Sequence, residues 1–196
     1  NTKIWFYCNM AASLGMYLYD KVYDKQTHRA AQNFLEYARE NYVGVSADGK
    51  LEWVTNYYDP TVNFKLNGGP GAGVSTAFLL APQNREFATF LYEAAVTASG
   101  YRGANAQVRA DAGLLLMARE LGDMAVADKI KAAVDRESDP RFFGRDNEMF
   151  GWWTNAPTEG YPRGQASATM MVSEIGRPGD WGRSLQAPFM DKFTAP

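Results

Sequence analysis

Hydrophobic residues recur at helical spacing along most of the chain. Residues 4–23 form the first such stretch, and one of its faces carries mostly small side chains that permit close helix packing. That face consists of Cys8, Ala12, Gly15 and Tyr19. A break at the sequence DKQT, where Thr27 is suited to cap a helix, leads to a second stretch that ends near Asn41. The pattern predicts a hairpin of two helices, the first of them an inner helix.

The hydrophobic period changes between residues 44 and 58. An Asp48-Gly49 turn precedes an alternating segment, which predicts a small β-hairpin. The alternating residues are Leu51, Trp53 and Thr55. The glycine-rich run at residues 68–73 then opens a third helix. Because this run lacks the GK[ST] ending of a phosphate-binding loop and follows no buried strand, we interpret it as a sharp turn before the helix.

The remaining helical stretches complete an alternating series. We predict helices at residues 74–80, 84–98, 104–121, 124–134 and 165–175. Apolar helices alternate with amphipathic ones, as expected for a toroid with an apolar inner ring. The predicted fold class is therefore all-α, with the β-hairpin as a small insertion. Residues 1–196 are interpreted as a single toroid domain that is incomplete at its N-terminal side.

The segment Phe142–Gln165 is too rich in glycine and proline to form one helix, and it is unusually aromatic. A long irregular segment inside a compact domain is usually functional, so we predict that it lines a binding site. The alternative is that its aromatic side chains close the end of a helical core. The residues assigned to substrate binding in this segment are Glu148, Phe150, Trp152, Trp153 and Tyr161.

The composition of the chain argues against several classes of function. The 196 residues carry a formal net charge of −2 without a basic run, which argues against nucleic acid as a partner. No apolar stretch approaches the roughly 18 residues of a membrane span. With only one cysteine and one histidine, the chain offers no internal disulfide and no thiolate or histidine-rich metal site. His28 is interpreted as solvated or capping. These features leave the compartment undetermined.

Candidate chemistry gathers where the predicted inner helices begin. Cys8 lies about one turn into the first of them, and a helix N-terminus favours the thiolate form of a cysteine in general. The alternative is a thiol packed in the core. Residues 53–59 are expected at the same face, with Trp53 and Tyr57 as substrate-binding residues. Carboxylates on that face could also act as a paired acid and base on a sugar or an alcohol. These carboxylates are Asp59, Asp146, Glu148 and Glu159.

Three blocks of sequence carry a family resemblance. They are KIWFYCN followed by LYD, GPGAGVSTAFL followed by FATFLYEAA, and GWWTNAPTEGYPRGQASATMMVSEIG followed by PGDWGR. Together they cover most of the chain in order and resemble the linalool dehydratase/isomerase family. The resemblance implies an (α/α)6 barrel, of which this chain would be the later portion. It also implies a cofactor-independent lyase or isomerase that acts on an allylic, terpene-like alcohol with cysteine thiols as acid and base.

The resemblance places Cys8, in the context FYCN, at the second of the family's two catalytic cysteines. The first cysteine, with a His, a Tyr and an Asp, would lie before Asn1 in a missing N-terminal half of the barrel, either a separate chain or a lost segment. Val74 departs from the family, in which an aromatic residue is expected. Homo-oligomers are also implied. Our hypothesis makes Cys8, Tyr58 and Asp59 catalytic, without a cofactor or a metal.

Two alternatives come from other classes. One is a carbohydrate-active toroid that uses Asp146, Glu148 or Glu159 as acid and base. The other is a non-catalytic helical-repeat scaffold that binds a partner through the aromatic segment.

Overall fold

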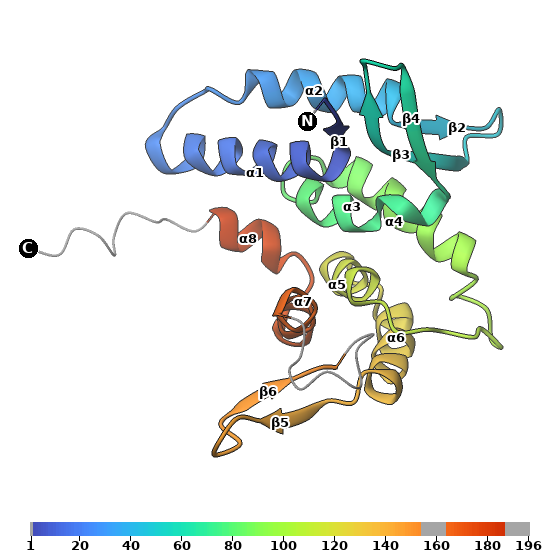
Figure 1. Cartoon of the computed structure of the whole chain (residues 1–196), viewed down its shortest axis with the longest axis vertical. Helices are drawn as coiled ribbons and strands as arrows, with labels where there is room; N and C mark the ends of the chain where they lie inside the picture. The colour runs from blue at the N-terminus through green and yellow to red at the C-terminus, as the bar shows by residue number, and fades with distance from the viewer. Residues whose placement is uncertain (1, 154–163, 187–196) are drawn as a thin grey trace, which may run out of the picture. The chain divides into compact units, whose positions relative to one another are not determined.

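Figure 1 shows the computed structural model, which describes residues 2–153 and 164–186. The described chain divides into two compact units, residues 2–98 with 181–186 and residues 99–153 with 164–180. The first, unit 1, contains β1 (Ile4–Trp5), α1 (Phe6–Tyr23), α2 (Arg29–Asn41), β2 (Val43–Val45), β3 (Leu51–Asp59), β4 (Phe64–Gly68), the short 3-10 helix η1 (Pro70–Gly73), α3 (Val74–Leu80) and α4 (Arg85–Ser99). The second, unit 2, contains α5 (Ala112–Leu121), α6 (Met124–Glu137), β5 (Arg141–Phe143), β6 (Met149–Gly151) and α7 (Gly164–Ile175). A last helix, α8 (Asp180–Gln186), belongs to unit 1 from Trp181 onward.

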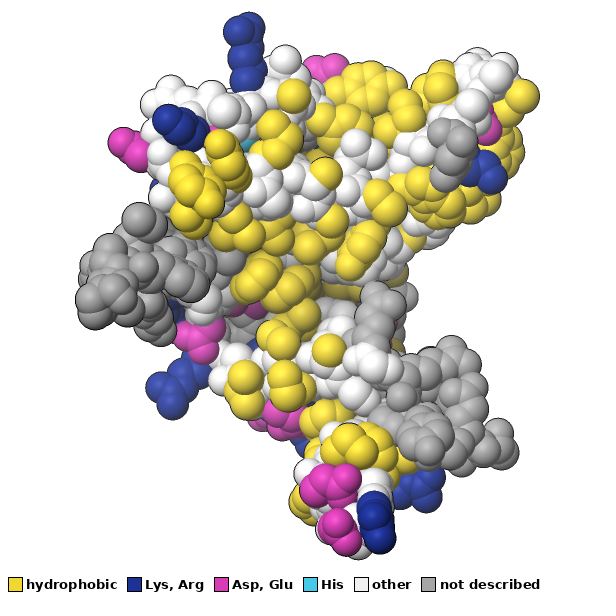
Figure 2. Space-filling view, turned by 60° about the vertical axis from the view of Figure 1, so that its left-hand side comes forward, with side chains coloured by type: hydrophobic (Ala, Val, Ile, Leu, Met, Phe, Trp, Pro, Cys, Tyr) yellow, Lys and Arg dark blue, Asp and Glu magenta, His cyan; other side chains and the backbone are white. Residues whose placement is uncertain are grey.

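Helix α1 buries a different face from the one that its small residues predicted. Phe6, Met10 and Leu14 are buried, and the Phe6 ring lies near those of Tyr42 and Phe87, with centroid distances of 5.5 and 6.4 Å. The predicted packing face is instead exposed, namely Cys8, Ala12, Gly15 and Tyr19. Both faces have helical spacing, and the face with the larger side chains removes more apolar area from water. Figure 2 shows hydrophobic side chains, drawn yellow, at the molecular surface.

Strand β3 is the centre of a four-stranded antiparallel sheet in unit 1. Strand β2 pairs with the beginning of β3, with Gly44 opposite Trp53, whereas β1 pairs with its end, with Trp5 opposite Tyr57. Strand β4 pairs with β3 as well. The β1 pairing joins segments about fifty residues apart in the sequence, and it positions the beginning of α1 beside the end of β3.

The predicted all-α (α/α)6 toroid with a small hairpin insertion is wrong. The chain is a mixed α/β structure, 56% helix and 15% strand, with antiparallel sheets of four and two strands. The hairpin of β2 and β3 was predicted, but β1, β4, β5 and β6 were not. Residues 4–5 continue the helical spacing of α1, so local periodicity could not separate them from the helix. Whether such a short segment joins a sheet depends on a distant partner strand.

Unit 2 is built on the pair α5 and α6. Asp111 caps α5 by accepting a 2.8 Å hydrogen bond from Leu114 N, so the helix begins later than the predicted residue 104. Gly122, with φ 83°, ends α5, and Asp123 caps α6. Lys131 of α6 forms a 3.0 Å ion pair with Glu174 of α7. This ion pair links α7 to α6, and the β5–β6 hairpin belongs to the same unit.

None of the described helices combines the length and the apolar character that a membrane crossing requires.

Candidate functional site

The candidate site in unit 1 lies where β1 meets the end of β3, and we call it the β1–β3 edge. It comprises Thr2, Lys3, Trp5, Cys8, Tyr57, Tyr58 and Asp59. Trp5 directly precedes α1, and its ring centroid lies 4.6 Å from that of Tyr57. Cys8 is the third residue of α1 and is exposed. Strand pairing therefore brings the predicted catalytic residues onto adjoining segments of one unit.

Asp59 is held as a carboxylate at this edge. Its Oδ1 accepts a 3.0 Å hydrogen bond from Thr61 N, and its Oδ2 accepts one of 3.0 Å from Thr2 Oγ1. The Thr61 hydrogen bond, followed by that of Thr2 and the nearby charge of Lys3, lowers the pKa of Asp59 below its usual value. Asp59 is therefore ionised near neutral pH and suited to accept hydrogen bonds.

The two tyrosines of the edge have different surroundings. Tyr58 donates a 3.2 Å hydrogen bond from its hydroxyl to Asn63 Oδ1. Tyr57 lies under the Lys3 ammonium, 4.9 Å from its ring centroid, and next to Phe64 at 6.2 Å. Because successive strand residues point to opposite faces, Tyr57 and Asp59 share one face of β3 and Tyr58 lies on the other. The β1–β3 edge therefore has side chains on both faces of β3.

Trp53 is also on β3, but it packs on β2 and not at the β1–β3 edge. It lies opposite Gly44 of β2, where a Cβ atom would overlap the indole ring. Along the strand it is about 13 Å from Tyr57, at roughly 3.3 Å per residue. Trp53 therefore covers the β2 backbone, and the β1–β3 edge is built without it.

The aromatic residues of unit 2 pack mainly on one another. Phe150 contacts Phe142 and Trp152, with ring centroids 5.0 Å apart in both pairs. Trp152 and Trp153 are only 7% and 2% exposed, and the Arg141 guanidinium lies 4.1 Å from the Trp153 ring centroid. The burial of Trp152 and Trp153 is what the core-closing alternative expects of these two residues, whereas Phe142 and Phe150 are exposed. Tyr161 lies outside the described residues.

The Glu148 carboxylate of the β5–β6 hairpin stabilises the turn of the hairpin. Glu148 Oε2 accepts a 2.9 Å hydrogen bond from the backbone N–H of Asp146. Hydrogen bonds from the backbone N–H groups of Glu148 itself and of Asp146 lower the pKa of Glu148. Glu159 lies outside the described residues. Since Glu148 is occupied by its own turn, the hairpin provides no support for the carbohydrate-active alternative.

The predicted site residues thus fall into two sets. Unit 1 contains Cys8, Trp53, Tyr57, Tyr58 and Asp59, whereas unit 2 contains Glu148, Phe150, Trp152 and Trp153. Sequence reasoning missed Thr2, Trp5 and Asn63. Nothing in the local pattern identified them, because their roles depend on the β1–β3 pairing and on the turn between β3 and β4.

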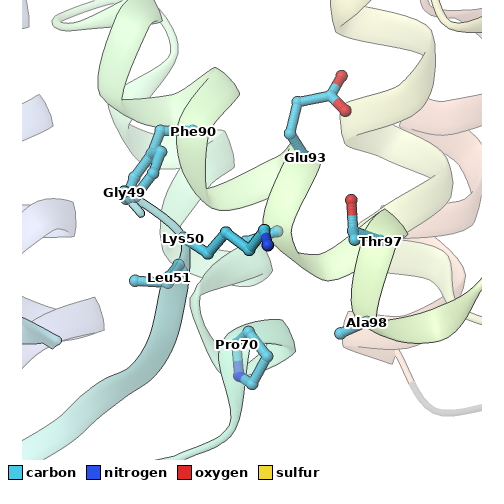
Figure 3. Close-up of a pocket in the computed structure, with 9 residues that line it drawn as sticks. Gly49, Lys50, Leu51, Pro70, Phe90, Glu93, Thr97 and Ala98 are labelled. Carbon is cyan, nitrogen blue, oxygen red and sulfur yellow. The ribbon is translucent and has the colours of Figure 1, made fainter. Parts of the chain in front are cut away.

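A pocket of about 350 Å³ lies elsewhere in unit 1, between the β2–β3 turn, η1 and α4 (Figure 3). Leu51, Pro70 and Phe90 provide apolar walls, and Lys50 extends across the pocket. Ala94 and Ala98 of α4 also line this pocket. Leu51 begins β3 and Asp59 ends it, a separation of about 26 Å along the strand. The pocket is therefore distinct from the β1–β3 edge.

Within the described residues, no group of three or more His, Cys, Asp and Glu side chains could hold a metal ion.

The chain matches no protein-family model, and no curated protein matches its sequence.

Proposed function

We propose that this chain provides a cysteine-based proton-transfer site to a cofactor-independent lyase or isomerase acting on a small, apolar, allylic alcohol. The supporting observation is the position of the exposed Cys8 thiol, one helical turn after Trp5, whose strand pairs with Tyr57 and Tyr58. The family resemblance points to the same cysteine.

The groups at the β1–β3 edge suit the elimination of water from such an alcohol. Elimination requires a proton for the departing hydroxyl, so that the C–O bond breaks and water leaves. A second group then takes a proton from the neighbouring carbon, and the C–H electron pair forms the new double bond. In an isomerisation, water instead adds to the other end of the allylic system.

In this proposal each residue has a separate role. The Cys8 thiol transfers the proton, because a thiol can donate its proton and the resulting thiolate can accept one. The Asp59 carboxylate, which lies on the same face of β3 as Tyr57, orients the substrate oxygen, whereas Tyr58 on the other face takes no direct part. The rings of Trp5 and Tyr57 lie next to the developing positive charge, which aromatic faces stabilise.

The test uses the fact that Cys8 is the only cysteine in the sequence. A thiol-selective alkylating reagent therefore reports on this residue alone. Linalool is expected to slow the alkylation, and its fully saturated analogue, which has no allylic system, to slow it less. Turnover of linalool is measured in parallel by gas chromatography and mass spectrometry.

The matched variants are Cys8→Ser and Ala12→Ser, since Ala12 is exposed one turn further along α1. Cys8→Ser is expected to lower turnover by about 10²-fold or more, the usual size of a lost acid–base group, while Ala12→Ser retains it. The proposal fails if linalool neither turns over nor protects Cys8, or if Cys8→Ser is fully active with an unchanged circular dichroism spectrum.

A further inference from the structure

Unit 2 contains a polar pocket that no part of the proposed function uses. Its volume is about 560 Å³, and it lies between the loop of residues 104–109 and one face of α6. Arg109 and Gln107 contribute from the loop, and Lys129, Arg136 and Glu137 contribute from α6. We call it the loop–α6 pocket.

The loop–α6 pocket carries an excess of positive charge. Arg109, Lys129 and Arg136 are cationic, and Glu137 is the acidic residue of its lining. Glu137 is ionised, because a hydrogen bond from the backbone N–H of Ala110, followed by one from Arg136, lowers its pKa. One negative group against three positive ones leaves the lining with an excess of two positive charges.

Two of the cations are held in place by backbone carbonyl groups between residues 101 and 108. Lys129 Nζ donates hydrogen bonds to Tyr101 O at 3.1 Å and to Gly103 O at 2.9 Å. Arg136 Nη2 donates to Val108 O at 3.2 Å and to Glu137 Oε1 at 2.5 Å. An ammonium has three N–H donors and a guanidinium five, so both cations keep donors for a ligand. The positive groups are thus positioned before any ligand arrives.

The Arg109 side chain, unlike those of Lys129 and Arg136, does not donate hydrogen bonds to backbone carbonyl groups of the described residues. Its backbone N–H donates to the Tyr101 hydroxyl at 3.2 Å, which fixes the loop at this residue. In the part of the chain that the structure describes, its guanidinium makes no hydrogen bond. Its positive charge nevertheless contributes to the lowered pKa of Glu137. Its full set of donors therefore remains open to a ligand.

We propose that the loop–α6 pocket binds a small, polar molecule that carries a phosphate group. A phosphate monoester has a charge of about −1.5 to −2 near pH 7, which matches the excess charge of the pocket, whereas a single carboxylate would neutralise only half of it. Guanidinium groups bind phosphate oxygens in a bidentate way, which favours arginine at such sites. The pocket is larger than inorganic phosphate, so there is room for the organic part of an ester.

The experiment is isothermal titration calorimetry of the whole chain at low ionic strength, with inorganic phosphate, glycerol 3-phosphate and acetate as probes. We expect glycerol 3-phosphate to bind, inorganic phosphate to bind equally or more weakly, and acetate to bind at least tenfold more weakly than either. Equal affinity for the two phosphates identifies the oxyanion alone as the recognised group. Tighter binding of the ester shows that the organic part is recognised as well.

The matched variants are Arg109→Gln and Arg145→Gln. Both remove one exposed arginine from unit 2, but Arg145 lies in the turn of the β5–β6 hairpin and outside the pocket lining. Arg109→Gln is expected to weaken phosphate binding at least tenfold with an unchanged circular dichroism spectrum. Absence of phosphate binding at millimolar concentration, equal binding of acetate, or an equal loss in Arg145→Gln overturns the proposal. None of these results depends on Cys8.

Discussion

At the scale of single residues, Asp20 shows how one carboxylate can hold a turn between two helices. Its oxygens accept hydrogen bonds from Thr27 N, at 3.0 and 2.8 Å, and from His28 N at 3.0 Å. They also contact the Thr27 hydroxyl at 2.6 Å and the His28 ring. His28 occupies the N-cap position of α2 but makes no side-chain capping hydrogen bond. The chain's only histidine is therefore part of a turn held by Asp20.

The pKa of Asp20 predicts a specific acid sensitivity. Burial alone would raise this pKa, but the hydrogen bonds from Thr27 and His28 outweigh burial and hold it well below its usual range. A lowered pKa in the folded state stabilises the fold above the unfolded pKa of about 3.9, and this stabilisation is lost as the pH falls through the folded value. Asp20→Asn should therefore destabilise the protein most at pH 6, and the difference from the wild type should shrink towards pH 2.

Urea unfolding midpoints between pH 6 and pH 2 measure this effect. The matched control is Asp24→Asn in the same turn, at a residue with φ 51° where asparagine is also tolerated. It should shift the midpoint little at any pH. Parallel curves for Asp20→Asn and the wild type would contradict the role assigned to the Asp20 carboxylate.

At the scale of elements, the β2–β3 pairing depends on the absence of a side chain at Gly44. The indole of Trp53 covers the backbone at this residue, and the strand register shifts between Gly44 and Val45. An aromatic ring across a glycine is a close approach that no larger residue allows without movement. This contact aligns β3, whose far end forms the β1–β3 edge.

Gly44→Ala should destabilise unit 1 by about 1–3 kcal/mol, the usual cost of overpacking. The matched variant is Gly15→Ala, because Gly15 lies inside α1 with no atom within 4 Å of an added Cβ. That change should instead stabilise by about 0.5–1 kcal/mol, because alanine is the better helix former. Chemical denaturation of both variants measures the two shifts. A stabilising Gly44→Ala would show that Trp53 moves away freely.

At the scale of the whole molecule, the chain returns to unit 1 after passing through unit 2. Trp181 of α8 stacks on Phe78 of α3, with ring centroids 4.7 Å apart and an interplanar angle of 12°. Its indole N–H also donates a 2.9 Å hydrogen bond to Phe78 O. Unit 1 is therefore assembled from two segments that are far apart in the sequence.

Trp181→Ala should weaken unit 1, and Trp153→Ala should weaken unit 2. Trp181 is half-buried, so we expect a loss of about 2 kcal/mol, below the roughly 3–5 kcal/mol expected for the fully buried Trp153. Hydrogen exchange followed by mass spectrometry distinguishes the units: Trp181→Ala should speed exchange in α1 and α3, and Trp153→Ala in α5 and α6. Equal acceleration in all four helices for both variants would mean that the two units open together.

Most helices of this protein can be recognised from local signals in its sequence. Helix α3 was predicted at residues 74–80 and observed at Val74–Leu80, and the predicted end of α2 near Asn41 also agrees with the structure. Helical spacing, caps and glycine stops are local signals, so they can be recognised without knowledge of distant contacts. The Asp48-Gly49 turn identified the β2–β3 hairpin for the same reason.

The pairing of distant segments, in contrast, depends on the three-dimensional fold. Ile4–Trp5 becomes a strand because the end of β3 pairs with it, and this pairing places Trp5, three residues before Cys8, opposite Tyr57. The buried face of α1 was likewise chosen by its neighbours, because both faces have helical spacing. The loop–α6 pocket depends on hydrogen bonds between segments about 28 residues apart, such as Lys129 to Tyr101. Such contacts form only when the fold brings their partners together, so the local pattern could not predict them.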